Sequence, residues 1–557
     1  MRTQSVSANH IVILCVMLAA GSLLNAQIPG WLWASSAGGR LDDYSWDLAT
    51  DAGGNRYVTG YFTGIADFGA VSLAGNDGYN FFAAKYDAAG NICWARPGIS
   101  SYSEGKGIAA DSTGCCYVAG SFLYSLDLGD FTLTSQGGAD IFVGKLDTDG
   151  NWLWAVNAGS GGYDYSGKGI ALDGAGNVCV TGLFEGTATF GANILVSSGE
   201  ADIFTAKLDP DGNWLWARRA GGPTYWDMGQ DLATDDSGNI YLTGHFIGSA
   251  DFGPTTLTAT GLRDIFVAKL DPDGNWLWAT KAGGIDDDWA GGIAVAADGS
   301  QYITGSFRRT AQFGAESLFS GNNNYDDIYA AKLDSAGNWL WARRAGGSSY
   351  HDYGHGIAVS ANGGCQVTGL FSNTADFGDF FLYSRGSGDI FASELDSVGN
   401  WLWAKRAGGE GWDSGFAIAA VPSGEICVTG IIAEEAAFKP FVLTSLGDQD
   451  IFIAEMAPGV DNDDELAPEA VSYSCLFPAR PNPCFRSETL RIKAQISAGE
   501  EGDLGLFNLR GQRLAQHNLG PGLHDIDFDT GDLASGIYLF RLSTRSSNEI
   551  RKVFIIK

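Results

Sequence analysis

Aromatic and acidic side chains recur together at seven places, about 62 residues apart. The pairs are Asp43 with Trp46, Glu104 with Tyr102, Asp164 with Tyr163 and Tyr165, Asp227 with Trp226, Asp288 with Trp289, Asp352 with Tyr353, and Asp413 with Trp412. Flat rings stack on the apolar faces of ligands and carboxylates accept hydrogen bonds from hydroxyl groups, a combination that suits sugars. Two carboxylates also suffice for glycoside chemistry, but the sequence singles out no such pair.

Nine of these residues form the candidate ligand-binding set: Asp43, Trp46, Trp226, Asp227, Asp288, Trp289, Asp352, Trp412 and Asp413. Each of the five acids lies five residues before the apolar residue of the first strand that follows. Ser103 and Tyr165 occupy this position in the other two units. A structural role competes with binding, because a carboxylate can accept the backbone N–H groups of a loop. Repetition in every unit favours the structural role, and both interpretations stay open.

Signs of catalysis or metal binding are sparse. His351, Asp352 and His355 cluster in one loop, but this spacing does not bring two ligands to one face. The acidic loops lack a recognisable calcium-loop spacing. The sequence contains no nucleophile elbow, phosphate loop or paired-cysteine metal motif. We therefore predict a protein that is not an enzyme, with no cofactor and no metal.

A repeat identifies the elements that position these loops. The motif W-L-W-A recurs, and its second tryptophan falls at residues 33, 94, 154, 216, 278, 341 and 403. Each unit holds four short strand signals, and turns such as Pro210, Asp211 and Gly212 have hairpin chemistry. This pattern predicts an all-β fold, a seven-bladed β-propeller of four-stranded antiparallel blades over residues 27–457. A linear β solenoid is the alternative.

The two ends of the array predict how the ring closes. The array begins with an unpartnered fourth strand at residues 31–34 and ends with an unpartnered third strand at residues 451–456. Pairing the two completes a seventh blade and removes two open sheet edges.

The loops are expected to differ between the two faces of this ring. The connections between strands 1 and 2 and between strands 3 and 4 are minimal turns on one face, whereas those between strands 2 and 3 and between blades are longer and lie on the other. Function usually resides in the longer loops of a rigid scaffold. In the segment Ala250–Gly253 and its equivalents, we expect the phenylalanine to fill a gap and the glycine to turn the chain. We expect a fold-maintaining role for the aspartates that begin the third strands: Asp140, Asp202, Asp264, Asp327, Asp389 and Asp450.

The repeat resembles a known family. The residues GIALD, GNVCVTGLF and DIFTAKLDPDGNWLW resemble the bacterial β-propeller repeat family often found in secreted proteins, and look like a longer relative of NHL-type propellers. The resemblance implies the fold and no single activity, since propellers serve many functions.

The amino end is predicted to be a secretory signal peptide, residues 1–26, with a membrane anchor as the alternative. Export allows disulfides. Six scattered cysteines are nevertheless expected to be buried and unpaired: Cys93, Cys115, Cys116, Cys179, Cys365 and Cys427. Cys475 and Cys484 are close enough in sequence for a bridge, which spacing alone does not decide. Residues 458–470 look like an acidic linker rather than a calcium loop.

Residues 471–557 break the repeat and alternate like a small Ig-like β-sandwich. Their motifs are ARPNP (479–483), LFNLRGQRL (506–514), LASGIYLFRL (533–542) and the final RKVFIIK. In this order they resemble the C-terminal sorting domain of type IX secretion cargo; Cys484 before Phe485 departs from the family. The resemblance implies the type IX machinery as partner, passage through the outer membrane, and release or surface attachment. An ordinary Ig-like accessory domain is the alternative.

Composition limits the partners. The chain has 65 acidic against 34 basic residues, a net charge of −31, which argues against nucleic acid and anionic membranes. Residues 471–557 hold 11 basic and 9 acidic residues, so the acidity belongs to the propeller and linker. No segment after the signal is expected to span a membrane. The sequence predicts a secreted or surface-displayed propeller that binds a glycan or protein; the alternatives are a structural or adhesion component and a glycan-active hydrolase or lyase.

Overall fold

The computed structural model describes residues 29–322, 324–347, 350–457, 474–476, 479, 484–485, 489–497, 499–531, 533–545 and 548–556. The chain divides into two compact units, residues 1–461 and 462–557, each described by itself. The predicted signal peptide and acidic linker lie outside the described residues. Among those that are described, no helix is long and apolar enough to cross a membrane.

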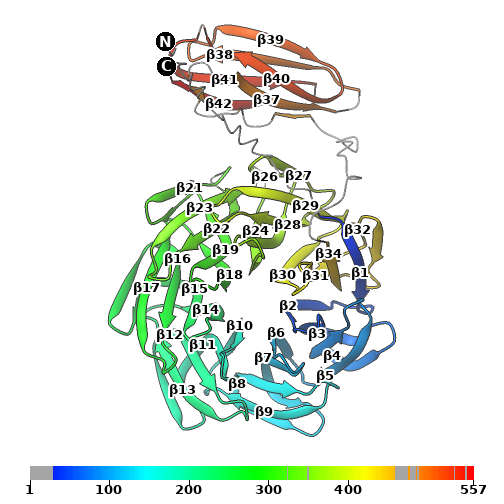
Figure 1. Ribbon diagram of the computed structural model, residues 1–557, viewed down its shortest axis with the longest axis vertical. Helices are drawn as coiled ribbons and strands as arrows, with labels where there is room; N and C mark the ends of the chain where they lie inside the picture. Colours follow the sequence, from blue (N-terminus) through cyan, green and yellow to red (C-terminus); the bar gives the residue numbers. More distant parts are fainter. Residues whose placement is uncertain are drawn as a thin grey trace, which may run out of the picture. The chain divides into compact units, whose positions relative to one another are not determined.

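Seven antiparallel blades form the first unit (Figure 1). Blade 1 comprises β2 (Tyr44–Thr50), β3 (Arg56–Asp67), β4 (Ser72–Tyr86) and β5 (Ile92–Gly98). Blade 2 comprises β6 (Ser103–Ala110), β7 (Cys116–Asp127), β8 (Thr132–Leu146) and β9 (Trp152–Ala158). Blade 3 comprises β10 (Tyr165–Leu172), β11 (Val178–Phe190), β12 (Asn193–Leu208) and β13 (Trp214–Ala220). Blade 4 comprises β14 (Met228–Thr234), β15 (Ile240–Phe252), β16 (Thr255–Leu270) and β17 (Trp276–Gly284).

The remaining blades continue the same order. Blade 5 comprises β18 (Trp289–Val295), β19 (Gln301–Arg308), β22 (Asp326–Leu333) and β23 (Trp339–Ala345). Blade 6 comprises β24 (Tyr353–Val359), β25 (Cys365–Phe371), β28 (Asp389–Leu395) and β29 (Trp401–Gly409). Blade 7 comprises β30 (Ser414–Ala420), β31 (Ile426–Ile432), β34 (Asp450–Met456) and, from the start of the array, β1 (Trp31–Ala37). The predicted seven-bladed propeller is therefore confirmed.

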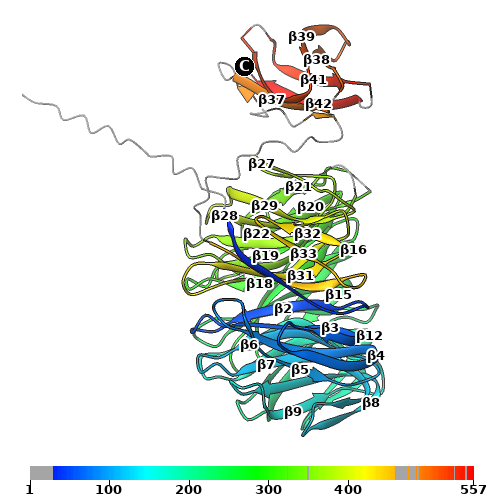
Figure 2. The same ribbon diagram turned by 90° about the vertical axis from the view of Figure 1, so that its right-hand side faces the viewer.

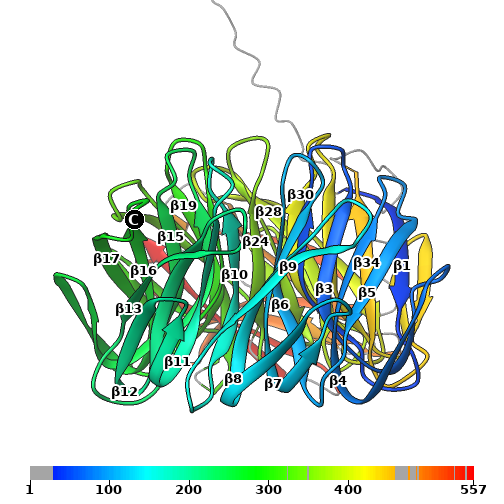
Figure 3. The same cartoon turned by 90° about the horizontal axis from the view of Figure 1, so that it is seen from below.

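The first strand of every blade lies at the axis. β2, β6, β10, β14, β18, β24 and β30 each pack against the first strand of the next blade, and β30 returns to β2 (Figure 1). In side view the strands of each blade run between two faces (Figures 2 and 3). We call the face of the loops between blades the loop face, and the face of the turns between strands 1 and 2 and between strands 3 and 4 the turn face.

The ring closes as predicted. β1 pairs antiparallel with β34, in a register that runs from Trp31 opposite Met456 to Ala37 opposite Ile451. Strands from the two ends of the array thus share one sheet, seen in Figure 1 as the blue β1 beside the yellow β34. Two open sheet edges are thereby removed.

The paired tryptophans pack within and between blades. In five of the six pairs the first tryptophan packs edge-on against the phenylalanine of its own blade, as Trp214 does on Phe190 with ring centroids 5.2 Å apart. In several units the second tryptophan reaches the next blade, as where the Trp216 Nε1–H donates to the Pro272 carbonyl at 3.2 Å. Equivalent contacts join Trp276 to Phe252, Trp339 to Phe313, Trp401 to Phe377, and Trp94, Trp154 and Trp341 to the carbonyls of Thr148, Pro210 and Ser397. The motif is therefore blade packing, and the phenylalanine fills a gap as expected.

The connection between second and third strands is β structure rather than the longer loop that sequence predicts. In blade 3 the strands extend through Phe190 and from Asn193, so the two form one long hairpin. The hairpin turns where the chain reaches Gly191, whose φ is +60°. Exposed Ile194 and Val196 explain the error, because alternation in a sheet that is covered on one face only is a weak strand signal.

Each hairpin also pairs with the end of the preceding blade's outer strand. The pairs are Gly38 with Asp67, Ile99 with Asp127, Gly159 with Thr189, Gly221 with Asp251, Gly284 with Ala311, Gly346 with Asp376, and Gly409 with Ala436. In blades 5 to 7 the hairpin consists of separate short strands, β20 (Thr310–Phe313) with β21 (Glu316–Phe319), β26 (Thr374–Phe377) with β27 (Phe380–Tyr383), and β32 (Glu435–Phe438) with β33 (Phe441–Thr444). Backbone pairing thus interlocks neighbouring blades around the whole ring.

The second unit contains two sheets. One comprises β35 (Cys475–Leu476), β37 (Thr489–Ile496) and β40 (Gly522–Asp529). The other comprises β36 (Cys484–Phe485), β42 (Asn548–Ile556), β41 (Gly536–Ser543), β38 (Gly502–Asn508) and β39 (Arg513–Leu519). Side chains of both sheets, including Leu490, Leu504 and Phe540, share one buried core. An Ig-like topology stays a prediction.

The cysteines follow the prediction in part. Cys116, Cys179, Cys365 and Cys427 are buried free thiols, but Cys93 is exposed and Cys115 half-buried. Cys93 lies between the two apolar positions of the outer strand β5 and faces solvent, where the other units have leucine. The side chain of Cys475 lies outside what the structure describes.

Candidate functional site

The repeated loop acid is a buried brace. Asp413 is fully buried, its Oδ2 accepts the Gly409 N–H at 2.6 Å, and its Oδ1 accepts the Ala433 N–H at 2.8 Å. The same two bonds are made by Asp43 with Gly39 and Thr63, Asp164 with Ser160 and Glu185, Asp227 with Gly222 and Ile247, Asp288 with Gly284 and Arg308, and Asp352 with Gly347 and Ser372. The brace ties each loop to the second strand of the following blade.

The register of this position needs one correction. Tyr165 pairs with Leu183 as Tyr44 pairs with Tyr61, so the residue equivalent to Asp43 is Asp164, not Tyr165. Counting from the apolar strand residue failed because Ile170 lies six positions after Asp164, whereas Leu48 lies five positions after Asp43. Ser103 is placed correctly, so six loops carry the acid and one carries serine.

Burial raises the pKa of all six loop acids. It raises the pKa of Asp43, Asp227 and Asp413 to about 7, although two backbone N–H groups oppose the shift in each case. It raises the pKa of Asp164 to about 6 and that of Asp288 to about 8, and holds the pKa of Asp352 well above its usual range. A second buried aspartate adds to the rise at Asp43, Asp227, Asp288, Asp352 and Asp413.

The four loop tryptophans divide into two kinds. Trp226 and Trp412 are 43% and 47% exposed, and the Trp226 Nε1–H donates to Glu200 Oε2 at 3.0 Å. Trp46 and Trp289 are half-buried, each beneath a cation: Lys106 Nζ lies 3.8 Å from the Trp46 ring centroid and the Arg263 guanidinium lies 4.2 Å from that of Trp289. Of the nine predicted site residues, only Trp226 and Trp412 therefore present large exposed surfaces.

A row of aromatic rings lies near the axis on the side of the loop face. Of these rings, only Trp46 was predicted from the sequence as a site residue. We call the row the aromatic crescent. Its rings follow in contact order Tyr102, Tyr79, Tyr61, Tyr44, Trp46, Phe416, His355, Tyr353, His351, Tyr325 and Tyr350, with neighbouring centroids 4.2 to 5.9 Å apart. Tyr79 and Tyr350 are 40% and 60% exposed. The crescent joins blades 5, 6, 7, 1 and 2, and only the closed ring brings these residues together.

Lys168 crosses the axis opposite the crescent. From β10 its Nζ donates to the Phe416 carbonyl at 2.9 Å and approaches the His355 carbonyl at 3.5 Å. The carboxylates of Asp47 and Asp231 accept the backbone N–H groups of Ile108 and Ile293 in the neighbouring blades. Burial lowers the pKa of Lys168 to about 8, against the opposing pull of both acids. The extra residue between Asp164 and Ile170 was the sequence signal that could have pointed to this lysine.

The histidine cluster does not assemble around a common point. His351 Nδ1 lies 2.8 Å from Asp326 Oδ2, whereas His355 is stacked on Tyr353 and packs at a tilt against Phe416 in the crescent. Among the described residues, no group of three or more His, Cys, Asp or Glu side chains is arranged to hold a metal ion.

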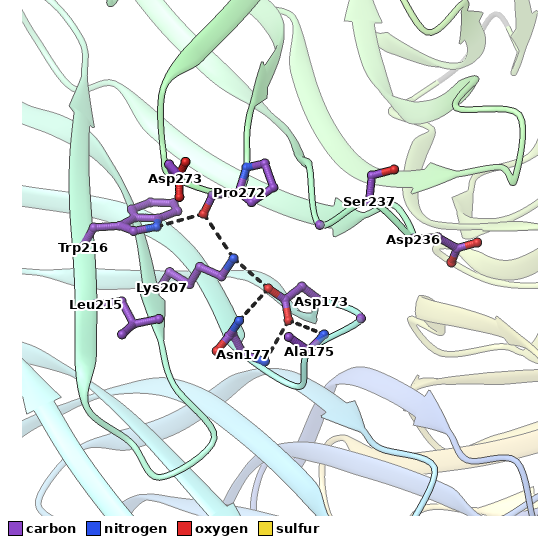
Figure 4. Close-up of a pocket in the computed structure, with 12 residues that line it drawn as sticks. Asp173, Ala175, Asn177, Lys207, Leu215, Trp216, Asp236, Ser237, Pro272 and Asp273 are labelled. Atoms are coloured by element: carbon purple, nitrogen blue, oxygen red, sulfur yellow. Dashed lines mark hydrogen bonds and ion pairs between the residues drawn. The ribbon is translucent and has the colours of Figure 1, made fainter.

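A hollow of about 610 Å³ lies on the opposite, turn face, between blades 3 and 4 (Figure 4). Its polar groups already bond to one another. Lys207 Nζ lies 2.7 Å from Asp173 Oδ2 and 3.2 Å from the Pro272 carbonyl, and Asn177 bonds to the same carboxylate. These bonds hold the turns together, so the hollow is a poor candidate for the ligand site.

Two families match parts of the chain. Residues 480–557 match the secretion system C-terminal sorting domain, and residues 215–245 match the β-propeller repeat. Both matches confirm the resemblances seen in the sequence. The type IX sorting domain directs the chain to secretion or the outer cell surface, so this is a secreted surface propeller protein.

More distant likenesses concern the fold. An uncharacterized WD repeat-containing protein of Acanthamoeba polyphaga mimivirus is 25% identical over 335 residues, 47% of this chain and 24% of that protein. The chain therefore spans about a quarter of that relative's length. PorZ, a surface component of the type IX secretion system of Porphyromonas gingivalis, is 11% identical, with 92% of this chain and 81% of that chain covered and a TM-score of 0.26. A luciferin-regenerating enzyme is 12% identical, with 63% and 90% covered and a TM-score of 0.30. These likenesses assign no function.

Proposed function

We propose that the exported chain binds a neutral glycan on its loop face, without catalysis. The observation that carries the proposal is the aromatic crescent beside the axis, together with the exposed rings of Trp226 and Trp412 on the same face. Flat rings with hydroxyl and carboxylate groups nearby suit a sugar, which has both an apolar face and a rim of hydroxyls.

The loops hold their rings in place before any ligand arrives. Trp226 and Trp412 each directly precede a buried brace, Asp227 and Asp413. Glu200 further orients the Trp226 indole. A side chain on a fixed backbone loses less entropy on binding than one on a mobile loop, which favours affinity.

Charge narrows the class of ligand. The excess of acidic over basic residues belongs to the propeller and linker, whereas residues 471–557 are near neutral. The acidic surface of the propeller repels negatively charged polymers, such as sulfated or uronic polysaccharides, at low salt. A neutral polymer meets no such penalty.

A protein ligand or a purely structural role on the cell surface is the competing proposal. Its support is the same exposed apolar surface, because aromatic residues are also enriched where proteins bind each other. A glycan-active enzyme would need accessible carboxylates, and the six loop acids are fully buried. We therefore place catalysis last.

A glycan array tests the proposal with the full exported chain. We expect saturable binding to neutral glycans that falls at least tenfold in Trp226→Ala or Trp412→Ala. Phe319→Ala is the matched control, since Phe319 is 65% exposed on the hairpin strand β21 and belongs neither to the crescent nor to the loop tryptophans, and should leave binding unchanged. Loss of binding in the control as well, or binding to no glycan, would favour the structural role; release of product would favour the enzyme.

A further inference from the structure

Six of the seven blade interfaces contain two buried carboxyl groups and a glycine. We call each set an acid clasp, formed by a third-strand aspartate, the loop aspartate of the next blade and the glycine between them. The clasps are Asp140, Asp164 and Gly159; Asp202, Asp227 and Gly221; Asp264, Asp288 and Gly283; Asp327, Asp352 and Gly346; Asp389, Asp413 and Gly408; and Asp450, Asp43 and Gly38. All twelve aspartates are at most 1% exposed.

In four clasps both carboxyl groups closely approach the glycine, and at Gly159 and Gly221 the third-strand aspartate does so. A Cβ added to Gly408 would lie 2.8 Å from Asp389 Oδ1 and 2.8 Å from Asp413 Oδ2. Gly408 also has a φ of +130°, which L side chains rarely adopt. Both oxygens therefore lie 2.8 Å from the same point, and that point admits no side chain.

One oxygen in every clasp lacks a hydrogen bond. The Oδ1 atoms of Asp140, Asp202, Asp264, Asp327, Asp389 and Asp450 are buried without a partner among the described residues. Both oxygens of the loop aspartate accept backbone N–H groups, so that residue has no hydrogen to offer unless it is protonated. Leaving a buried carboxylate oxygen unpaired is costly, and two carboxylates that share a site ordinarily hold one proton between them.

The seventh interface supports a joint role for the three residues. There Asn80, Ser103 and Ile99 stand where the other interfaces have the two aspartates and the glycine. Asn80 Nδ2 donates to the carbonyls of Phe62 and Gly78, and Ser103 Oγ accepts the Phe81 N–H at 3.0 Å. Amide and hydroxyl groups satisfy this interface without any charge. The acids and the glycine are therefore present together or absent together within one chain.

We propose that each acid clasp binds one proton, held between Oδ1 of the third-strand aspartate and Oδ2 of the loop aspartate, and that these protons lock the blade interfaces of the loop face until the pH rises. The proton gives the orphan oxygen its missing hydrogen bond. This inference is independent of the proposed glycan ligand.

In four of the six clasps a paired cation agrees with the binding of one proton. The third-strand aspartate is paired with Arg219, Lys281, Arg344 or Arg406 in four clasps, so one proton brings the three charges to zero. Asp140 has the neutral Asn157 instead. The other charged groups that face the clasps are Asp42, Glu185, Asp286, Asp326 and Arg385. The raised pKa of the loop acids described above points the same way.

Infrared spectroscopy of the full exported chain tests the proposal directly. Protonated carboxyl groups absorb separately from carboxylates. We expect a protonated-carboxyl band at pH 6, where exposed aspartates are ionised, and its progressive loss as the pH rises from about 6 through about 8 and the clasps ionise. Absence of the band at pH 6 would overturn the proposal, and so would its persistence without change to pH 10.

Two variants assign the band to the clasps. In Asp389→Asn the new side-chain amide donates a hydrogen bond to Asp413, so this clasp no longer needs a proton. We expect the protonated-carboxyl band to fall by about one sixth, because one clasp in six is lost. The triple change Asn80→Asp, Ser103→Asp and Ile99→Gly installs a seventh clasp and should raise the band by a similar amount. An unchanged band in a folded Asp389→Asn protein would contradict the assignment. If neither variant folds, the pH titration of the unchanged chain still decides the matter.

Discussion

The two faces of the propeller use aspartate for the same bond with opposite electrostatic results. On the turn face, Asp209 accepts the N–H groups of Asp211 and Asn213 and the Asn213 amide, and these bonds lower its pKa. On the loop face, Asp413 also accepts two backbone N–H groups, yet burial raises its pKa to about 7. Hydrogen bonds favour the charged form, but the loss of hydration outweighs them when the carboxylate is fully buried.

This contrast separates two structural tasks. The turn-face acids each shape a single turn. Their motif D-x-x-G-N recurs at Asp51, Asp87, Asp147, Asp173, Asp209, Asp235, Asp271, Asp334 and Asp396. The loop-face acids join two blades, which requires them to lie inside. We therefore expect the turn face of the propeller to tolerate substitution of its aspartates better than the loop face does.

The largest effect is expected from filling an acid clasp. Gly408→Ala places a Cβ 2.8 Å from two buried oxygens at a φ of +130°, and we expect the free energy of unfolding to fall by about 3 kcal/mol or more. Gly161→Ala is the control, because no atom lies within 4 Å of the added Cβ in a comparable loop. Chemical unfolding of both variants makes the comparison; equal stabilities would contradict it.

Removing one acid from each face measures the difference between them. Asp413→Ala leaves two buried N–H groups without an acceptor, and we expect a loss of about 2–3 kcal/mol. Asp209→Ala exposes its N–H donors to water, so a loss of about 1 kcal/mol is expected. Urea titration of the two variants gives both values. A greater loss for Asp209→Ala would reverse our view of the faces.

The pH dependence of stability follows from the opposite shifts. A raised pKa contributes stability that is fully present below the unfolded value, 3.8, and is lost as pH rises through about 7, as for Asp43, Asp227 and Asp413. A lowered pKa contributes stability that is present above 3.8 and is lost as pH falls, as for Asp209 and Asp271. The melting temperature should therefore peak at mildly acidic pH. A maximum above pH 8 would be inconsistent with this assignment.

The smallest effect on stability is expected for the exposed ring on the loop face. Trp226→Ala removes a side chain that is 43% exposed, and we expect the free energy of unfolding to change by about 0.5 kcal/mol or less while ligand binding falls at least tenfold. Comparing thermal unfolding with glycan binding separates the two roles. A large loss of stability would make Trp226 a structural residue.

Much of the fold could be predicted because its units repeat. The tryptophan pairs and the turn residues recur at a fixed spacing, and the unpaired strands at 31–34 and 451–456 predict the closure that β1 and β34 make. The hairpins between second and third strands were missed because their exposed residues leave only a weak alternating pattern. The sorting domain was predictable from local motifs in a fixed order.

The site was predicted less well, because it depends on which side chains meet around the ring. The loop acids were identified by type, with Asp164 misplaced by one residue, but their complete burial was not foreseen. Tyr44, Phe416 and His355 lie hundreds of residues apart or in different blades, and nothing local links them.

The sequence by itself thus determined the repeat, the number of blades, the closing strand and the export domain, because each depends on local patterns or on their spacing. Only the tertiary structure decided that the loop acids face inward in pairs, that Lys168 spans the axis, and that eleven rings form one crescent. The physical reason is that burial and long-range contacts arise only when the ring closes. An aspartate at an exposed turn therefore stays charged and shapes the turn, whereas an aspartate buried between two blades is proposed to share a proton and braces the interface.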